Sequence, residues 1–316
     1  MIARLAVVAL LLCAPANAAA GAATMCDAVW RDGPRGRELP VRIRLPDGVA
    51  RVPAVLYSPG LGGSRTAGET WAAGWAAAGM AVIQMEHPGS DAAVYANITT
   101  HQERVARVRA AASSQQLLAR IGDVGFVLDE LARRPREGAC DLARIDPDRL
   151  GLAGHSMGAW VVQALAGQRF GPTGTRLQDM RLRAFIAMSP TANGAIPPDV
   201  SFGGIHRPFL VLTGTRDGVP DSKDPAARAA ALAQRTGVYA GLPADGRKAQ
   251  ALFDGADHMM FAGNRRGAED RLGRSVQAAG LAISTAWWRR WLLLDEGADA
   301  VLARPPLAPG DQWQRK

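Results

Sequence analysis

A serine between two glycines is the feature of this sequence whose residue types and spacing could most directly do chemistry. The pentapeptide Gly154-His155-Ser156-Met157-Gly158 fits the pattern G-x-S-x-G, with an apolar run, 150–153, before it and a helix-like stretch, 159–166, after it. A serine on such a strained strand-to-helix turn exposes its hydroxyl at the carboxyl edge of a sheet. A side chain at either flanking glycine would crowd the neighbouring strand and helix. The pattern therefore predicts a nucleophile at Ser156 and an oxyanion-binding N–H at Met157.

A serine hydroxyl is a weak nucleophile unless a base removes its proton during attack. On an elbow of this kind the chain order is nucleophile, then acid, then histidine, so the base must lie well downstream. Of the five histidines, only His206 and His258 do. His206 precedes the apolar run 209–213, at the wrong end of a parallel sheet, whereas His258 follows the run 250–253. We therefore predict that His258 is the general base.

The carboxylate that orients this histidine is expected in the loop after the preceding strand. Asp217 follows the run 209–213 at a short distance, and Asp221 and Asp224 lie further along the same loop as alternatives. Asp257 is disfavoured, because adjacent residues rarely turn both side chains to one point. We predict that Asp217 fixes the imidazole tautomer and stabilises the imidazolium without itself taking the proton.

A glycine-rich loop is expected to supply a second N–H donor to the oxyanion. Ser58-Pro59-Gly60-Leu61-Gly62-Gly63-Ser64 follows the early apolar run 54–58, the position from which such a donor comes. We predict that the backbone N–H groups of Leu61 and Met157 together form the oxyanion hole. Losing one such donor typically costs about 3 kcal/mol of transition-state stabilisation.

Three segments together resemble one branch of the α/β-hydrolases. They are SPGLGGSR at 58–65, EHPGSD at 86–91 and GHSMG at 154–158. In this order and at similar spacing they look like the platelet-activating-factor acetylhydrolase and dienelactone-hydrolase-like branch, over most of the chain from about residue 39 to 258. The resemblance implies that Leu61 and Met157 donate the oxyanion hydrogen bonds, and that Glu86-His87 belongs to a structural loop near the pocket.

The sequence departs from this branch at two informative positions. Pro59 stands where the acetylhydrolases usually have histidine, and Pro88-Gly89 replaces their more charged loop. Dienelactone hydrolases proper use a cysteine nucleophile, so Ser156 argues against that reaction.

The elements that must position these residues can be read from the alternation of apolar runs with helix-like stretches from Pro53 onward. The expected strands are 54–58, 80–85, 149–153, 184–188, 209–213 and 250–253. The expected helices are 67–78, 100–118, 121–131, 159–166 and 274–294. The tryptophans of the last helix, Trp287, Trp288 and Trp291, are expected to pack in the core. The pattern predicts one α/β domain of the α/β-hydrolase fold, with a mostly parallel sheet and helices on both faces.

Composition limits the classes of partner. The formal net charge of the 316 residues is +8, with 37 Lys and Arg against 29 Asp and Glu. The arginines do not gather with aromatic residues in one tract, so no nucleic-acid partner is expected, although a preference for anionic surfaces or substrates stays open. There is no phosphate-cradling P-loop and no cluster of residues at metal-ligand spacing, so no metal or organic cofactor is expected.

The N-terminus resembles a secretory signal. A short basic start, an apolar stretch over 5–13 and the sequence Ala16-Asn17-Ala18 predict cleavage after residue 18, leaving a single domain over 19–316 in the periplasm or the medium. The alternative is an N-terminal helix of the mature protein. The apolar stretch is too short to span a bilayer, so no stable membrane insertion is expected. Export favours a disulfide between Cys26 and Cys140, with two buried thiols as the alternative.

Taken together, these residues predict a serine hydrolase that cleaves small carboxylic esters through an acyl-enzyme. Acyl transfer to an acceptor other than water needs the same three residues and remains an alternative. A catalytically silent binding module is a third reading, since fold alone does not determine function. The segments that could cover the site, 91–116 and 170–183, are polar and lack the apolar face of a lipase lid. Short acyl chains, about C2 to C6, are therefore expected.

Overall fold

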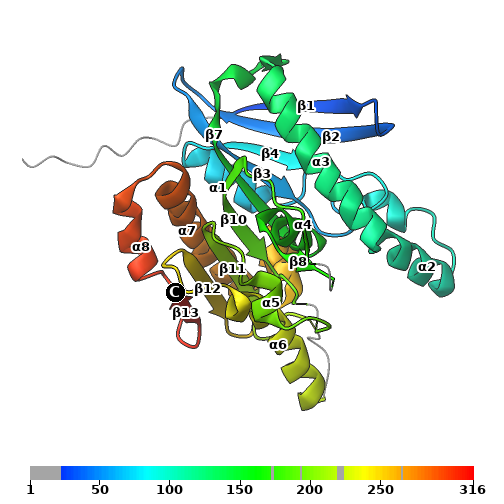
Figure 1. Ribbon diagram of the computed structural model, residues 1–316, viewed down its shortest axis with the longest axis vertical. Helices are drawn as coiled ribbons and strands as arrows, with labels where there is room; N and C mark the ends of the chain where they lie inside the picture. The colour runs from blue at the N-terminus through cyan, green and yellow to red at the C-terminus, as the bar shows by residue number, and fades with distance from the viewer. Residues whose placement is uncertain (1–22, 172–173, 193, 219–223, 265) are drawn as a thin grey trace, which may run out of the picture.

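A large mixed sheet flanked by helices forms the centre of the molecule (Figure 1). The computed structural model describes residues 23–171, 174–192, 194–218, 224–264 and 266–316. The strand order in the nine-stranded sheet is β1-β2-β4-β3-β7-β10-β11-β12-β13. The strands are β1 (Ala23–Asp32), β2 (Arg37–Pro46), β3 (Val52–Ser58), β4 (Ala81–Met85), β7 (Ile145–His155), β10 (Leu182–Met188), β11 (Phe209–Gly214), β12 (Lys248–Phe253) and β13 (Gln312–Arg315).

The six central strands are parallel to their neighbours and coincide with the six apolar runs expected from the sequence. Pairing is parallel from β4 through β3, β7, β10 and β11 to β12. The pairs β1–β2, β2–β4 and β12–β13 are antiparallel. The central strands are buried on both faces, which explains why they read as continuous apolar runs. The carboxyl ends of the parallel strands therefore meet at one edge.

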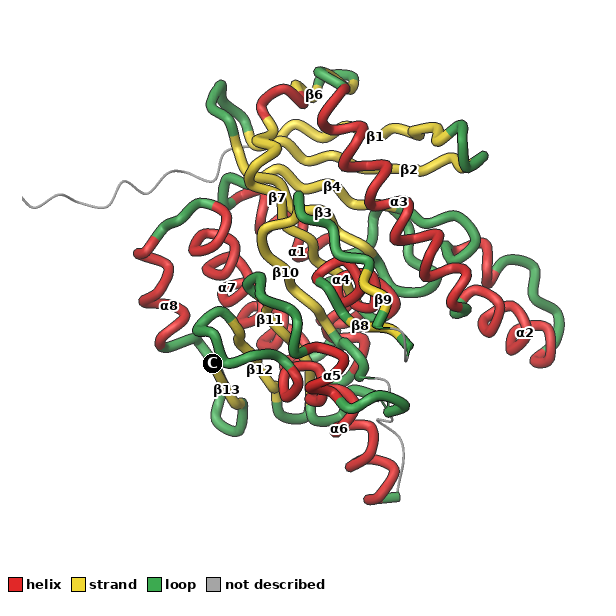
Figure 2. Tube along the Cα trace, in the orientation of Figure 1, coloured by secondary structure: helices red, strands yellow, loops and turns green. Residues whose placement is uncertain are grey.

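Helices cover both faces of this sheet (Figure 2). On one face α1 (Glu69–Ala77) and α7 (Arg271–Leu292) share a core with Val55, Ala153 and Leu210. On the other, α3 (Ser114–Arg133), α4 (Met157–Ala166), α5 (Pro198–Phe202) and α6 (Pro225–Gly241) share a core with the alternate strand residues. Trp287 and Trp288 are fully buried and Trp291 is partly buried, as expected for core packing.

The remaining elements are short or lie at the periphery. They are α2 (His101–Ala111), α8 (Asp299–Ala303), the two-residue strands β5 (Arg136–Glu137), β6 (Cys140–Asp141), β8 (Arg169–Phe170) and β9 (Thr175–Arg176), and the 3-10 turns η1 (Ala92–Tyr95), η2 (Leu142–Arg144), η3 (His258–Ala262), η4 (Arg266–Ala268) and η5 (Glu296–Ala298). Figure 1 shows α2 projecting beyond the end of α3.

Two local expectations differ from the structure. The helical stretch 100–118 does not run through, because α2 ends at Ala111 and α3 begins at Ser114. The reason is the Ser113 side chain, which accepts a hydrogen bond from the Gln116 N–H and so starts a new helix. The hairpin of β1 and β2 lies before the first expected strand; alternate β2 side chains face the core while the others are polar, so no continuous apolar run marks it.

The disulfide expectation is confirmed. Cys26 of β1 is bonded to Cys140 of β6, 114 positions later in the chain. The expected signal segment, 1–18, lies outside the described residues. In the part of the chain that the structure describes, no helix combines the length and apolar character needed to cross a bilayer.

Candidate active site

The turn that carries Ser156 is a strained strand-to-helix elbow between β7 and α4. Ser156 has φ 56° and ψ −116°, a backbone conformation that non-glycine residues rarely adopt. Its N–H donates to the Met188 carbonyl of the neighbouring β10 at 2.9 Å, which holds the turn against the sheet. A Cβ at Gly154 would clash with the Gly158 backbone, and one at Gly158 with the Ser58 carbonyl. Both flanking glycines are therefore needed for close packing, as the sequence predicted.

Three predicted residues from three different loops form one hydrogen-bonded line. His258 Nε2 lies 2.9 Å from Ser156 Oγ, and His258 Nδ1 lies 2.8 Å from Asp217 Oδ1. Ser156 and His258 are partly exposed, whereas the Asp217 side chain is buried. A substrate can therefore reach the hydroxyl and the imidazole, while the carboxylate is protected from water.

The surroundings of Asp217 keep its carboxyl group ionised. Burial alone would raise its pKa, but the hydrogen bond from His258 and the positive charge of Arg235 outweigh burial, and the pKa lies below its usual value. Arg235 Nε lies 3.1 Å from Asp217 Oδ1, and the Thr213 hydroxyl donates to Oδ2 at 2.8 Å. An ionised carboxylate can only accept, so His258 carries its proton on Nδ1. Its Nε2 is then free to accept the Ser156 proton.

The rival residues occupy other structural positions. Asp224 caps the start of α6 by accepting from the Ala226 N–H. Asp257 caps η3 by accepting from the N–H groups of the two residues after His258. Asp221 lies outside the described residues. His206 lies before the start of β11, at the opposite end of that strand from Asp217.

A second histidine, His155, supports the first. Its Nε2 donates to the His258 carbonyl at 2.9 Å, and the two ring centroids lie 4.7 Å apart. Burial lowers the pKa of His155 to about 3, so the ring is neutral at ordinary pH and adds no charge beside the triad. This position is variable in the pattern G-x-S-x-G, so the motif does not indicate what His155 contacts.

The glycine-rich loop runs against the elbow, where the oxyanion hole was predicted. A Cβ at Gly60 would lie 3.4 Å from the Ser156 Cβ, so the backbone leading into Leu61 passes directly beside the nucleophile. The Gly62 N–H donates to the Ser90 carbonyl at 2.8 Å, which fixes the far side of this loop. Met157 is the first residue of α4. The loop that carries Leu61 and the start of α4 at Met157 therefore meet at Ser156.

A buried arginine also binds the backbone of the glycine-rich loop. Arg120 of α3 has no exposed surface, and its guanidinium donates to the carbonyls of Pro59 at 2.5 Å and Gly60 at 3.2 Å. It also donates to the Ser90 side chain at 2.8 Å and the Ser90 carbonyl at 3.2 Å. Burial lowers the pKa of Arg120 to about 10, which leaves it cationic at neutral pH. Sequence reasoning missed this residue, which lies between the expected helices 100–118 and 121–131; the available signal was the charged pair Arg120 and Asp123 one turn apart on the buried face of α3.

A second Ser–His–Asp array lies beneath the loop. His87 Nε2 lies 3.0 Å from Ser58 Oγ, and His87 Nδ1 lies 3.0 Å from Asp123 Oδ2. All three side chains are fully buried, and Arg37 binds the Asp123 carboxylate through two hydrogen bonds of 2.7 Å. Since no substrate can reach it, this array is suited to holding the end of β3 rather than to chemistry. It gives the Glu86-His87 segment the structural role that the resemblance implied.

Among the described residues, no group of three or more His, Cys, Asp or Glu side chains is placed to hold a metal ion. Comparison of the sequence with models of protein families and with curated proteins finds no match. The site is therefore interpreted from its own geometry.

Proposed function

We propose that this protein is a serine hydrolase of the α/β-hydrolase fold that cleaves carboxylic esters through an acyl-enzyme. The observation that carries the proposal is the line from Ser156 Oγ through the His258 ring to the buried Asp217 carboxylate. It lies at a strained elbow, beside a loop that can supply oxyanion donors. Strand order and chain order support the fold, since nucleophile, acid and histidine follow β7, β11 and β12 at one sheet edge.

The reaction follows from these positions. As Ser156 Oγ bonds to the ester carbonyl carbon, its proton moves to His258 Nε2, and the carbonyl oxygen becomes an oxyanion that Leu61 N–H and Met157 N–H stabilise. The tetrahedral intermediate collapses by breaking the bond to the alkoxy oxygen, which takes the proton from His258 and leaves as an alcohol. Water then attacks the acyl-enzyme, giving its proton to His258, and the carboxylic acid is released as Ser156 regains a proton.

The proposed location is an exported one, the periplasm or the medium. The leader-like residues 1–18 support export, and the Cys26–Cys140 disulfide is of the kind that persists in an oxidising compartment. The proposed substrates are small esters with short acyl chains, about C2 to C6, because the polar segments near the site lack the apolar face of a lipase lid.

Labelling with a fluorophosphonate tests the reaction class. We expect the label on the peptide that contains Ser156, and none on Ser58, because the Ser58 array is closed to solvent. The Ser156→Ala variant should lose the label and reduce kcat by roughly 10⁴–10⁶-fold. Labelling that survives in Ser156→Ala would overturn the assignment of the nucleophile.

Chain-length preference is tested with p-nitrophenyl esters from acetate to palmitate, measured below and above the micellar threshold. We expect kcat/KM to be highest for the short esters, with no jump in rate at the interface. A rate that climbs steadily to palmitate would make the protein a lipase.

A further inference from the structure

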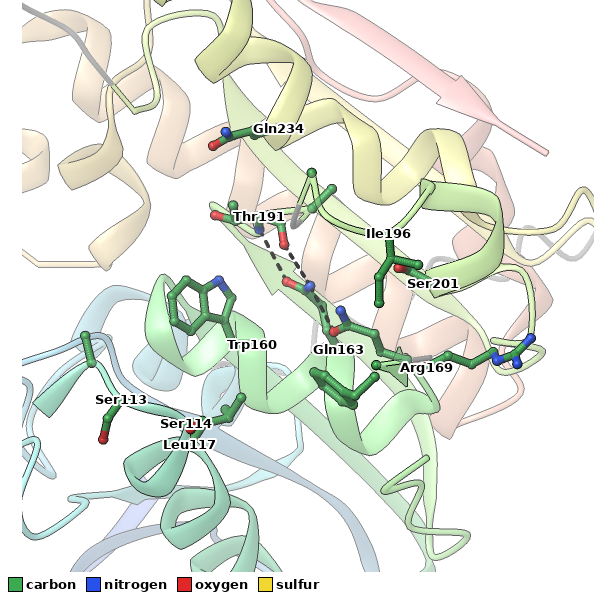
Figure 3. Close-up of a pocket in the computed structure, with 16 residues that line it drawn as sticks. Ser113, Ser114, Leu117, Trp160, Gln163, Arg169, Thr191, Ile196, Ser201 and Gln234 are labelled. Atoms are coloured by element: carbon green, nitrogen blue, oxygen red, sulfur yellow. Dashed lines mark hydrogen bonds between the residues drawn. The ribbon is translucent and has the colours of Figure 1, made fainter. Parts of the chain in front are cut away.

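A cavity of about 460 Å³ lies beside α4, on the same helix that begins at the nucleophile (Figure 3). Its walls come from the start of α3, from α4 and the residues after it, from the loop after β10 and from α6. Figure 3 shows Leu117 and Trp160 towards one end and Ile196 and Arg169 towards the other. Ligand pockets typically enclose about 300–1,000 Å³, so the cavity is large enough for an organic group.

The cavity walls are continuous with the residues that hold the proposed triad. Trp160 lies one helical turn after Ser156, and its backbone N–H donates to the Ser156 carbonyl at 3.3 Å. Thr191, also in the wall, lies three residues beyond Met188, whose carbonyl fixes the elbow. The Arg235 side chain bonds to both Thr191 and Asp217. One wall of the cavity therefore contains a residue that lies one helical turn after the nucleophile along α4.

The cavity and the proposed base lie on opposite faces of the sheet. The turn that begins with His258 packs with α1 and α7, where Trp71 Nε1 donates to the Phe261 carbonyl at 3.1 Å. The cavity is lined instead by α3, α4 and α6, on the other face. Because His258 delivers its proton to the departing alkoxy oxygen, the alcohol must leave on the α1 and α7 face. The acyl group then points away from His258, towards the cavity.

The lining of the cavity is mainly apolar. Leu117, Trp160, Phe170 and Ile196 contribute apolar side chains. The amide of Gln163 is paired on both sides, since its Nε2 donates to the Thr191 carbonyl at 3.1 Å and its Oε1 accepts from the Thr191 N–H at 3.4 Å. Among the described residues that line the cavity, only Arg169 is charged. Such a lining favours a neutral apolar group, and its single positive charge disfavours a cationic one.

We propose that this cavity is the acyl pocket of the enzyme and takes a neutral apolar acyl group larger than acetyl, such as hexanoyl or benzoyl. The inference rests on the proposed ester hydrolysis. It refines that proposal by placing the best substrates at the larger end of the short-chain range.

The neighbouring leucines of α3 provide a matched pair of variants. Leu117 lines the cavity and packs against the core, whereas Leu118 points away and is 55% exposed. Leu117→Trp should fill the cavity and lower kcat/KM for p-nitrophenyl hexanoate and benzoate by about 10-fold or more relative to the acetate. Leu118→Trp should leave these ratios at their wild-type values. Retained activity on the acetate shows that each variant is folded.

A second series of substrates tests which side of the ester the cavity holds. With acetyl esters of methyl, butyl and hexyl alcohols, Leu117→Trp should not change the relative rates. If it discriminates among the alcohols and not among the acyl groups, the assignment to the acyl side is wrong. If Leu117→Trp lowers kcat/KM equally for the acetate, the hexanoate and the benzoate, the cavity is not the acyl pocket. If the wild-type protein hydrolyses no ester and Ser156 takes no label, the proposed function itself fails.

Discussion

At the scale of single residues, the proposed general base His258 is held from two sides. Asp217 is buried and held by Thr213 and Arg235, so the orientation of His258 does not depend on solvent. His155 then holds the backbone of the same histidine. His258 is therefore constrained at its ring by Asp217 and at its backbone carbonyl by His155 at the end of β7, which is the pre-organisation that general-base catalysis requires.

Replacing the carboxylate tests this arrangement. Asp217→Asn should lower kcat by about 10³–10⁴-fold, somewhat less than Ser156→Ala, because an amide can donate to Nδ1 and favour the wrong tautomer. Steady-state kinetics on one p-nitrophenyl ester measures the effect. Asp224→Asn is the matched control, since Asp224 caps α6 and should change kcat little. An inactive Asp224→Asn beside an active Asp217→Asn would reverse the assignment.

At the scale of elements, α3 contacts the glycine-rich loop 58–64 through one charged side chain, Arg120. Arg120 donates to the two successive carbonyls of Pro59 and Gly60 in this loop. Fixing the carbonyls also fixes the direction of the next peptide N–H, that of Leu61. Because Arg120 is fully buried, we expect it to act on the proposed reaction as a positioning residue, through the loop.

Removing this side chain should impair catalysis more than binding. We expect Arg120→Met to lower kcat by up to about 100-fold, in the range seen when one oxyanion donor is lost, with a much smaller change in KM. The pH at which the rate falls on the acidic side of the profile should stay the same, because the substitution does not alter the proposed proton transfer through His258. Arg109→Met, at an exposed position of α2, is the control for loss of charge. Equal effects of the two substitutions would show that position 120 has no role in placing the loop.

The sequence predicted the parts of this site that are local. The elbow, the six central strands and the loops that follow them are marked by short patterns. Chain order together with the strand ends selected His258 and favoured Asp217 over Asp221 and Asp224. It did not predict Arg120, His155 or the Ser58–His87–Asp123 array, because each acts through contacts between segments far apart in the chain. The sequence did not predict the β1–β2 hairpin for a different reason, since its half-buried strands carry many polar residues.

At the scale of the whole molecule, two buried neutral histidines make the fold sensitive to acid. Burial lowers the pKa of His87 to about 4 and that of His155 to about 3, whereas an unfolded histidine takes its proton near pH 6.5. At pH values between the folded and the unfolded pKa of each histidine, the unfolded chain binds more protons than the folded one. The free energy of unfolding must therefore fall as the pH drops from about 7 towards 4.

Denaturant titrations at a series of pH values measure this slope. Each histidine should contribute up to about 1.4 kcal/mol per pH unit within its window. His155→Gln should flatten the slope by the share of one histidine. A stability that is constant from pH 7 to 4 would contradict the neutral state of the two buried rings.

The disulfide divides the site along the chain. The covalent loop that Cys26 and Cys140 close contains Leu61, His87 and Arg120, whereas Ser156, Asp217 and His258 all lie beyond it. Leu61, one of the two proposed oxyanion donors, thus lies inside the covalent ring, whereas Met157 and the three residues proposed to move the proton lie outside it. In the chain-entropy model the bond constrains the unfolded chain, so its reduction would free the segment that carries Leu61 and Arg120 and leave the segment that carries Ser156 as it was.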